Sequence, residues 1–253
     1  MKLGLVIPYR DRLEHLNIFI PYITKHLKKH NIDYKIVVVE QCNKNPFNRS
    51  KLMNIGAKYI YDEVDYLCFH DVDLIPDIDV DYNIYDNQVM HLCGYLILNR
   101  DNVIKNKDFN SYMDFDYYFN KFKFKDYTKS LLLGGVTIIR KNIWKQNKWN
   151  EIFQGWGRED YEYYHRLKNF KKYDIYQSDS RFISLNHKSN DKKKRFLCFK
   201  FSSYYKKLNY YIFYQLKFLY SINKKKDKFL KFNTKYKIIK TIKNNDYDFI
   251  LID

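Results

Sequence analysis

The feature that most constrains the fold of this chain is an alternation of strand-like and helix-like segments near its N-terminus. Residues 2–7 (KLGLVI), a run ended by Pro8, and residues 34–39 (YKIVVV) are short apolar runs rich in β-branched side chains, as buried strands are. Between them, apolar residues recur at three- and four-residue spacing from Leu13 to Leu27, which predicts a helix with one buried face. A strand, a helix and a second strand in this order predict a parallel pair of strands.

The same alternation continues. A second helix is predicted from Asn48 to about Tyr61, followed by a third strand at residues 66–70 (YLCFH), whose apolar run stops at Asp71. We therefore expect an α/β fold with a mainly parallel central sheet flanked by helices on both faces. In such sheets ligands bind beyond the carboxyl ends of the strands. Polar side chains follow all three strands there: Arg10, Asp11 and Arg12 the first, Glu40 and Gln41 the second, and Asp71 and Asp73 the third.

The pair Asp71 and Asp73 is a candidate metal site. Alternate residues at a strand end point in the same direction, so both carboxylates could face one cation bridged to phosphate oxygens. The alternative is an ordinary turn, because Asp and Pro are common in turns. Apolar sequence on both sides favours the metal site, since two buried carboxylates without a counter-charge would be strongly unfavourable.

A second candidate constellation is residues 155–167 (GWGREDYEYYHRL). Two glycines flank Trp156 and predict a hinge around a large planar side chain. Glu159 and Asp160 then open an amphipathic stretch where a helix begins, and the alternative is that they only cap that helix. The combination of all these residues is more specific than any of its parts and favours a functional role.

Length and composition agree with one domain. With 253 residues, 45% of them hydrophobic, the chain can bury a sizeable core. We expect a single domain over 1–253, with a nucleotide- and metal-binding half at 1–80, an acceptor-binding and catalytic half at 81–190, and a basic segment at 191–253. The sequence shows no apolar run long enough to span a membrane and no signal peptide, so we expect a cytoplasmic protein of bacterial or viral origin, or a module cut from a longer chain. The four cysteines are expected to be reduced packing residues, with Cys68 and Cys93 inside strand-like apolar runs.

The net charge of +17 permits nucleic acid, an anionic membrane or a phosphorylated ligand as partner. The excess of lysine occurs together with many Asn, Tyr, Ile and Phe residues, a mixture that a coding bias also explains, so no specific nucleic-acid partner is expected. The densest lysine clusters, KKKR at 192–195 and KKKDK at 224–228, lie in the C-terminal segment. A peripheral contact of that segment with a membrane surface therefore stays open.

Taken together, the motifs resemble the β-1,4-galactosyltransferase family, glycosyltransferase family 7. The matching blocks are IPYRDRLEHL (7–16), PFNRSKLMNIG (46–56), DYLCFHDVDLIP (65–76), GGVTIIRK (134–141), FQGWGREDYEYYHRL (153–167) and the region around His187. The resemblance implies a GT-A fold, a UDP-sugar donor, usually UDP-galactose, an inverting mechanism, and Mn²⁺ or another divalent cation. It also implies that FNTKYKIIKTIKNNDYDFILID at the C-terminus supplies two closing strands of the same domain.

The resemblance assigns roles to individual residues. Those implied to bind the nucleotide sugar are Pro8, Tyr9, Arg10, Arg12, Phe47, Asn48, Arg49, Asp71, Val72, Asp73 and Trp156. Those implied to bind a carbohydrate or glycoconjugate acceptor are Gly135, Trp156, Gly157, Arg158, Glu159, Asp160 and Arg195. Asp73 and His187 are the implied metal ligands. Where the family supplies a further metal ligand, as Met or His, this chain has Ser184 and Leu185, and Lys129, Leu132 and Tyr161 also depart from the family at acceptor-facing positions.

From these roles we expect transfer of a hexose, most simply galactose, onto an acceptor hydroxyl in β-linkage. Asp160 would act as general base and Glu159 would orient the acceptor, while Trp156 would close over the donor and exclude water. Three alternatives stay open. The chain could transfer another hexose or an N-acetylhexosamine, it could bind sugars without turnover, or residues 192–240 could bind RNA or a membrane.

Overall fold

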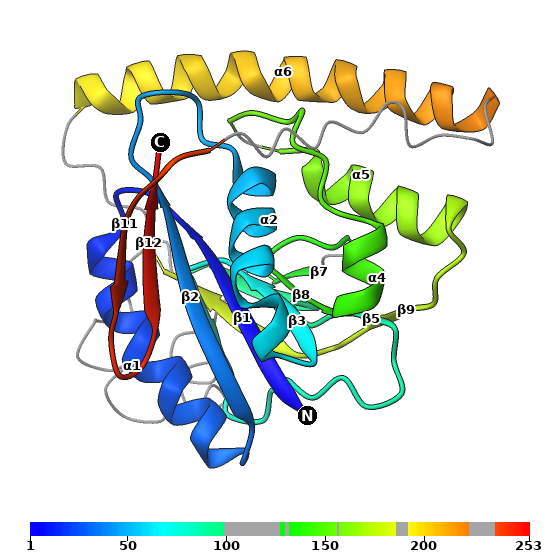
Figure 1. Ribbon diagram of the computed structural model, residues 1–253. Helices are drawn as coiled ribbons and strands as arrows, with labels where there is room; N and C mark the ends of the chain where they lie inside the picture. Colours follow the sequence, from blue (N-terminus) through cyan, green and yellow to red (C-terminus); the bar gives the residue numbers. More distant parts are fainter. Residues whose placement is uncertain (99–126, 130–131, 156, 186–191, 223–235) are drawn as a thin grey trace.

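The alternation at the N-terminus forms the centre of a large mixed sheet (Figure 1). The computed structural model describes residues 1–98, 127–129, 132–155, 157–185, 192–222 and 236–253, with the backbone alone for 127–129, 192–203 and 221–222. The strands are β1 (Lys2–Tyr9), β2 (Asp33–Gln41), β3 (Tyr66–His70), β4 (Leu74–Pro76), β5 (Val89–His91), β6 (Tyr95–Leu98), β7 (Tyr127–Lys129), β8 (Val136–Arg140), β9 (Ile175–Gln177), β10 (Arg181–Ser184), β11 (Ile238–Lys243) and β12 (Asp248–Ile252). The helices are α1 (Leu13–Lys29), α2 (Arg49–Ile60), α4 (Lys141–Gln146), α5 (Glu159–His165) and α6 (Lys192–Ile222), with a 3-10 turn at Tyr61–Glu63 and a π-helical turn at Arg166–Phe170.

The large sheet has the strand order β11-β12-β2-β1-β3-β8-β5-β9. Strands β12, β2, β1 and β3 are parallel to one another, and β5 is parallel to β9, whereas β8 runs antiparallel to both of its neighbours and β11 runs antiparallel to β12. The carboxyl ends of β1, β2 and β3 therefore meet at one edge of the sheet. The expected mainly parallel α/β sheet is confirmed.

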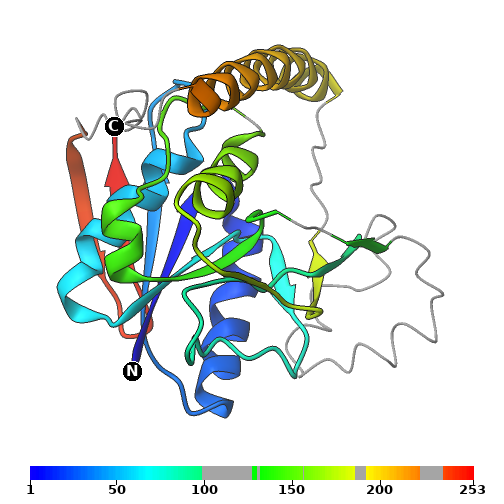
Figure 2. The ribbon, with the colours of Figure 1, turned by 90° about the vertical axis from the view of Figure 1, so that its right-hand side faces the viewer.

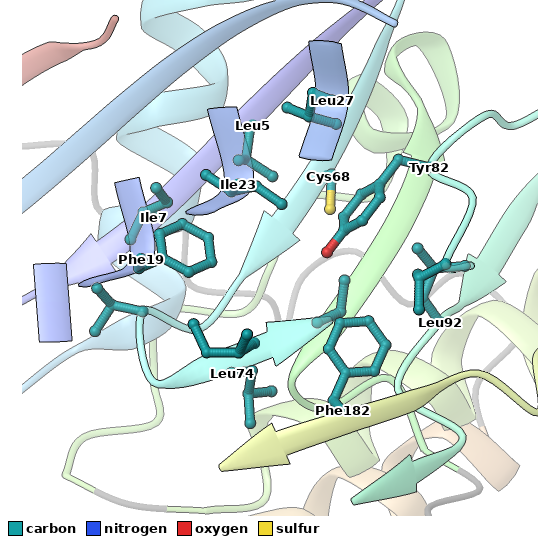
Figure 3. Close-up of a cluster of buried hydrophobic side chains, with 14 of the residues drawn as sticks. Leu5, Ile7, Phe19, Ile23, Leu27, Cys68, Leu74, Tyr82, Leu92 and Phe182 are labelled. Carbon is teal, nitrogen blue, oxygen red and sulfur yellow. The ribbon is translucent and has the colours of Figure 1, made fainter. Parts of the chain in front are cut away.

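Helix α1 covers one face of this sheet. Its residues Phe19, Ile23 and Leu27 are fully buried and point toward Leu5 and Ile7 of β1 (Figure 3). A smaller sheet, with the order β4-β10-β6-β7, packs against the same core through Ile75, Phe182 and Ile183. The Tyr22 hydroxyl of α1 donates a hydrogen bond to the Pro76 carbonyl at 2.9 Å, which ties α1 to the small sheet.

Helix α2 covers the opposite face, because alternate residues of β1 and β2 point away from α1 (Figures 1 and 2). Val6 of β1 and Val39 of β2 pack there against α2. Gly56 lets the helix approach closely, since an added Cβ would lie 2.5 Å from Val6 Cγ1 and 2.9 Å from Val39 Cγ2. Both contacts are too short for real atoms, so a glycine is required at this helix position.

Substituting Gly56 by alanine is expected to destabilise the protein by about 1–3 kcal/mol, because overpacking two strands outweighs the gain in helix propensity. Urea unfolding would measure the loss. The exposed Lys58→Ala on the same helix serves as control and should change the free energy of unfolding by no more than about 0.5 kcal/mol. A Gly56→Ala protein as stable as the parent would contradict the packing described here.

The C-terminal residues extend the large sheet. Strand β12 runs parallel to β2, with Phe249 opposite Val38 and Ile250 opposite Val39, and β11 pairs antiparallel with β12 as the edge strand. Ile250 and Ile252 are fully buried against α2 and its neighbours. The two closing strands implied by the resemblance are present. One sheet thus includes strands from all three segments, 1–80, 81–190 and 191–253, and the division into those functional halves stays a prediction.

Helix α6 was not expected from the sequence. It has 31 residues and lies across one side of the domain as the outermost element (Figures 1 and 2). Phe213, Leu216 and Tyr220 are buried and pack with Phe153 in a small separate cluster. The Tyr220 hydroxyl donates to the carboxylate of the buried Glu162 at 2.7 Å. In the part of the chain that the structure describes, neither α6 nor any other helix is both long and apolar enough to cross a membrane.

Several local expectations need correction. Pro8 does not end the first strand, because β1 continues to Tyr9 and Pro8 lies in register with Val39 of β2. Cys68 and Cys93 are buried free thiols as expected, but Cys93 lies just after β5 and not within a strand. Cys42 is a free thiol that is exposed, so it is not a core packing residue. The fourth cysteine, Cys198, lies in the part of α6 whose side chains are outside the description.

Candidate active site

The end of β3 and the start of α2 meet in an ion pair. Asn48 caps α2, accepting a hydrogen bond from the Lys51 backbone N–H at 2.9 Å, so Arg49 is the first residue of the helix. From there Arg49 Nε donates to Asp71 Oδ1 at 2.7 Å. Arg49 Nη1 lies 3.8 Å from Glu159 Oε1, at the start of α5. One guanidinium therefore links residues from three of the predicted blocks.

The glycine pair before β8 lies against both acidic motifs. The Asp71 backbone N–H donates to the Gly135 carbonyl at 3.0 Å. A Cβ added at Gly134 would lie 2.9 Å from Asp160 Oδ2, so the carboxylate of Asp160 rests directly over this glycine. Gly135 has a positive φ of 72°, which a side chain would strain. Because Gly134 and Gly135 have no side chains, the backbone before β8 lies close to both Asp71 and Asp160.

The backbone before the acidic pair is sharply turned. Gly155, Gly157 and Arg158 have φ values of 71°, 96° and 79°, in the left-handed region that favours glycine. This geometry explains the two glycines of the motif, and Trp156 between them lies outside the described residues. The Arg158 guanidinium lies 4.3 Å from the centre of the Tyr161 ring and 4.7 Å from that of Tyr210 in α6. The turn leads directly into α5, as expected for Glu159 and Asp160 at a helix start.

The acidic groups of this cluster hold protons more tightly than free carboxyls do. The pKa of Glu159 is raised from 4.5 to about 7, mainly by burial and next by the nearby charge of Asp160. The positive charge of Arg49 acts in the opposite direction. Burial also raises the pKa of Asp160 and of Asp71, again against the effect of Arg49. Three carboxyl groups around one arginine leave an excess of negative charge, which a cation or a hydrogen-bonding ligand would relieve.

The raised pKa of Glu159 predicts a stability that falls with rising pH. Between about pH 4.5 and 7 the unfolded chain releases this proton while the folded protein keeps it. The free energy of unfolding therefore falls by up to about 3 kcal/mol over that pH range. Glu159→Gln should remove this fall in stability. Urea unfolding at pH 5 and pH 8 would measure it, with the exposed Glu14→Gln as control. Equal pH profiles for the parent and Glu159→Gln would contradict the assignment.

Arg10, which follows β1, and Arg49, which begins α2, each have a guanidinium N–H group without a hydrogen-bond acceptor among the described residues. Arg10 Nε donates to the Gln41 carbonyl at 3.2 Å and Nη1 to the Asn45 carbonyl at 2.8 Å, while the guanidinium covers the Phe47 ring at 5.4 Å. Arg10 Nη2 and Arg49 Nη1 are buried and have no hydrogen-bond acceptor among the described residues. Buried N–H groups of this kind usually have a partner, and phosphate oxygens suit the guanidinium geometry.

The predicted metal ligands are only half described. The D-V-D motif forms a turn between β3 and β4, with the Leu74 N–H donating to the Asp71 carbonyl at 3.3 Å, so the two aspartates do not alternate along a strand end as expected. The Leu185 backbone N–H donates to the Asp73 carbonyl at 2.7 Å, so the end of β10 lies directly beside this turn. His187 comes two residues later and lies outside the described residues. Within the described ranges no group of three or more His, Cys, Asp or Glu side chains is arranged to hold a metal ion. Asp73 with His187 and a ligand's phosphate oxygens therefore stays a predicted site.

The remaining predicted residues differ in their surroundings. Tyr9 is buried at the end of β1 and its ring packs against Phe249 at 5.9 Å, and Val72 is buried beneath the D-V-D turn. Arg12 lies exposed at the N-terminus of α1. The Asn48 side chain caps α2 and donates to the Glu151 carbonyl at 2.8 Å, which is a structural role.

Arg195 lies in the part of α6 whose side chains are not described, so its acceptor contact stays a prediction.

The structure adds residues that sequence reasoning missed. His91, at the end of β5, donates from Nε2 to the Gly134 carbonyl at 2.9 Å, because a carbonyl oxygen can only accept. Burial lowers the pKa of His91, and its hydrogen bond to the Gly134 carbonyl holds the Gly134–Gly135 pair in place. A single histidine within the apolar run at residues 89–93 was the available signal. From α6, Asn209 donates to the Gln154 carbonyl at 2.8 Å, and Tyr205 packs against Gly155. No local pattern pointed to these α6 contacts.

Comparison with known proteins decides the family. Residues 1–88 match the N-terminal region of glycosyl transferase group 7. Over 171 residues the chain is 33% identical to β-1,4-galactosyltransferase 1 of Bos taurus, covering 66% of this chain and 36% of that protein. The chain belongs to the β-1,4-galactosyltransferase family. Within this family it is also 29% identical to β-1,4-galactosyltransferase 7 of Drosophila melanogaster, over 66% of this chain and 45% of that protein.

Family members differ in the sugar that their names specify. The β-N-acetyl-D-glucosaminide β-1,4-N-acetylglucosaminyl-transferase of Lymnaea stagnalis is 30% identical over 172 residues, which are 67% of this chain and 31% of that protein. The chain spans less than half the length of the curated relatives it matches. The matched residues 1–88 include the blocks that we predict to bind the nucleotide and the metal.

A solved structure from the family shares the fold. It is a mutant of the Drosophila β-1,4-galactosyltransferase 7 in complex with manganese, UDP-Gal and xylobiose. The superposition has a TM-score of 0.62 at 21% sequence identity and covers 99% of this chain and 93% of that chain. The GT-A fold expected from the sequence is therefore confirmed.

Proposed function

We propose that this protein is an inverting, metal-dependent glycosyltransferase that moves galactose from UDP-galactose to a hydroxyl of a carbohydrate acceptor in β-linkage. The observation that carries the proposal is the cluster formed by Arg49, Asp71, Gly134, Glu159 and Asp160 at the carboxyl ends of the strands. These residues come from four separated blocks, and the roles that we propose for them are those that the resemblance to the family implies.

Arg10 and Arg49 are suited to the diphosphate of the donor. Each has a buried guanidinium N–H group without an acceptor among the described residues, and a guanidinium stays charged at any physiological pH. Arg10 is held by carbonyls at the end of β2, and Arg49 by Asp71. Phe47, beneath Arg10, accepts at its carbonyl from the Gly155 N–H at 2.8 Å, which couples the nucleotide block to the glycine turn.

Asp160 would remove the proton from the acceptor hydroxyl. It sits over Gly134, which leaves no side chain between the carboxylate and the chain before β8. Burial raises its pKa and thereby makes it a stronger base than an exposed aspartate. Glu159, with a pKa of about 7, would hold an acceptor hydroxyl by hydrogen bonding beside it. Inversion follows when the hydroxyl attacks from the face opposite the leaving UDP.

Asp73 and His187 would hold the divalent cation. Asp73 lies in the turn between β3 and β4, and its carbonyl accepts from the N–H of Leu185, two residues before His187. Two residues of extended backbone span about 7 Å. When bound, Mn²⁺ would offset the negative charge that develops on the departing diphosphate. Carboxylate, imidazole and phosphate oxygens are all ligands that Mn²⁺ accepts.

A second candidate donor is UDP-N-acetylglucosamine. The Lymnaea relative, whose name specifies N-acetylglucosaminyl transfer, is as similar to this chain as the galactosyltransferases are. One substituent on the sugar ring is distinguished by a few pocket contacts, so the choice is a matter for experiment.

The test is UDP release by the purified chain from a panel of UDP-sugars, with Mn²⁺ present or chelated, and with and without carbohydrate acceptors such as β-xylosides and β-N-acetylglucosaminides. We expect acceptor-stimulated, Mn²⁺-dependent release from UDP-galactose. Release from UDP-N-acetylglucosamine alone would select the second donor. UDP binding with no release from any donor would indicate a sugar-binding derivative, and no binding at all would refute the proposal. The cytoplasmic location stays a prediction.

A further inference from the structure

Helix α6 has two distinct faces, and only the inner one is explained by the fold. At 31 residues it is about 46 Å long. Inward, Asn209, Phe213, Leu216 and Tyr220 are buried against α5 and the residues before it. The opposite face points away from the domain, and both views place α6 as the outermost element (Figures 1 and 2).

That outer face has a stripe of large aromatic side chains. Tyr204, Tyr211 and Phe218 recur at seven-residue spacing, which keeps them on one side of a helix, and each is more than 60% exposed. Tyr214 lies between them on the same side and is also exposed. Aromatic side chains of this size usually bury most of their surface in a domain, so a row of four exposed ones marks an interaction surface.

The charge of α6 is entirely of one sign. Residues 192–222 contain seven lysines and one arginine, and no aspartate or glutamate, whereas the whole chain has 29 acidic residues. Lys207 lies within the aromatic stripe, and Lys206 and Lys217 lie exposed at the border between the outer and inner faces of the helix. A surface that is both aromatic and uniformly basic fits a partner that is negatively charged and offers an apolar layer beneath its charges.

We propose that the outer face of α6 docks the protein on the surface of an anionic lipid bilayer. The helix would lie in the plane of the membrane, with Tyr204, Tyr211, Tyr214 and Phe218 at the headgroup level and the lysines reaching the lipid phosphates. On its inner face the same helix contacts Gln154, Gly155 and Arg158. The docked surface is therefore about one helix diameter, roughly 10–12 Å, from the glycine turn that precedes Glu159.

Two other partners fit less well. A second copy of the chain would bring two helices together that each have eight basic residues and no acidic one, which repel each other. Single-stranded RNA would supply negative charge, but proteins that bind it combine aromatic platforms with a groove that follows the backbone. Here the aromatic side chains stand on the outer face of a single helix. The lipid surface is the partner that uses both the stripe and the charge.

The test is sedimentation of the full chain with vesicles of phosphatidylcholine, with and without phosphatidylserine, in the absence of UDP-sugar. We expect binding to the phosphatidylserine vesicles that weakens with added salt. Tyr211→Ser/Phe218→Ser and, separately, Lys207→Glu/Lys217→Glu should each weaken binding by about tenfold or more. The matched controls, Tyr85→Ser/Tyr176→Ser and Lys28→Glu/Lys58→Glu, change equally exposed aromatic residues and equal charge elsewhere and should bind like the parent.

Circular dichroism of each variant would establish that it is folded. Equal loss in the Lys28→Glu/Lys58→Glu control would show that only net charge matters and would overturn the proposal. Absence of vesicle binding would also overturn the proposal. RNA binding in place of vesicle binding, lost in the Tyr211→Ser/Phe218→Ser variant, would point to a nucleic-acid partner instead. A dimer that dissociates in that variant would point to a second copy of the chain. Because binding is measured without donor or acceptor, failure of the proposed transferase activity would leave this result unaffected.

Discussion

Replacing Asp160 by asparagine is expected to lower kcat for sugar transfer by about 10²–10⁴-fold while UDP binding stays within a few-fold of the parent value. The amide keeps the shape of the carboxyl group over Gly134 but cannot take the acceptor proton. Steady-state transfer assays would give kcat, and calorimetric titration with UDP would give the affinity. The reaction would then run without its base but with its donor site intact.

A control for this substitution lies nearby. Asp174 is highly exposed and pairs only loosely with Lys168, so Asp174→Asn should leave both kcat and UDP binding unchanged. Full transfer activity in Asp160→Asn would exclude Asp160 as the base. Loss of UDP binding together with activity would instead indicate that Asp160 supports the fold of the glycine turn.

Arg49→Met is expected to destabilise the protein by about 3–5 kcal/mol at pH 8, because it leaves the carboxylates of Asp71 and Glu159 close together without their shared cation. The pKa values of both acids should rise further, since Arg49 now holds them down. The loss should therefore be smaller at pH 5, where these groups are more fully protonated. Urea unfolding at the two pH values would measure the difference.

Arg12→Met provides the comparison for stability, because Arg12 is exposed at the start of α1. It should shift the free energy of unfolding by no more than about 0.5 kcal/mol at either pH. An Arg49→Met protein whose stability falls equally at pH 5 and pH 8 would show that packing of the arginine, and not its charge, stabilises the site. Arg49→Met should also bind UDP more weakly.

Much of the fold was predictable because it depends on local patterns. The apolar run at residues 66–70 is strand β3 without a shift at either end, and the periodic stretch from Leu13 forms α1. The helix predicted from Asn48 is α2, which begins one residue later because Asn48 is its N-cap. Strand ends were less accurate, since Pro8 is compatible with a strand when its neighbours in the sheet fix the backbone.

The candidate site was predictable as a set of motifs but not as an arrangement. Asp71, Gly135 and Asp160 could be named from short motifs, yet their contacts join positions far apart in the chain. That Arg49 would pair with both Asp71 and Glu159 was not apparent, nor was the support of Gly134 by His91. Such pairings depend on how β3, β8 and α5 pack, which no local pattern records.

Side-chain periodicity acts between near neighbours, so the chain's local patterns were enough to establish the α/β class, the order of the first strands and helices, and the acids and arginines available at the strand ends. The packed fold was needed to establish which charges meet, how far burial shifts the pKa of Glu159, and which face of α6 is left outside. Those properties arise from contacts between segments distant in the chain, where solvent is excluded by packing that all of them share.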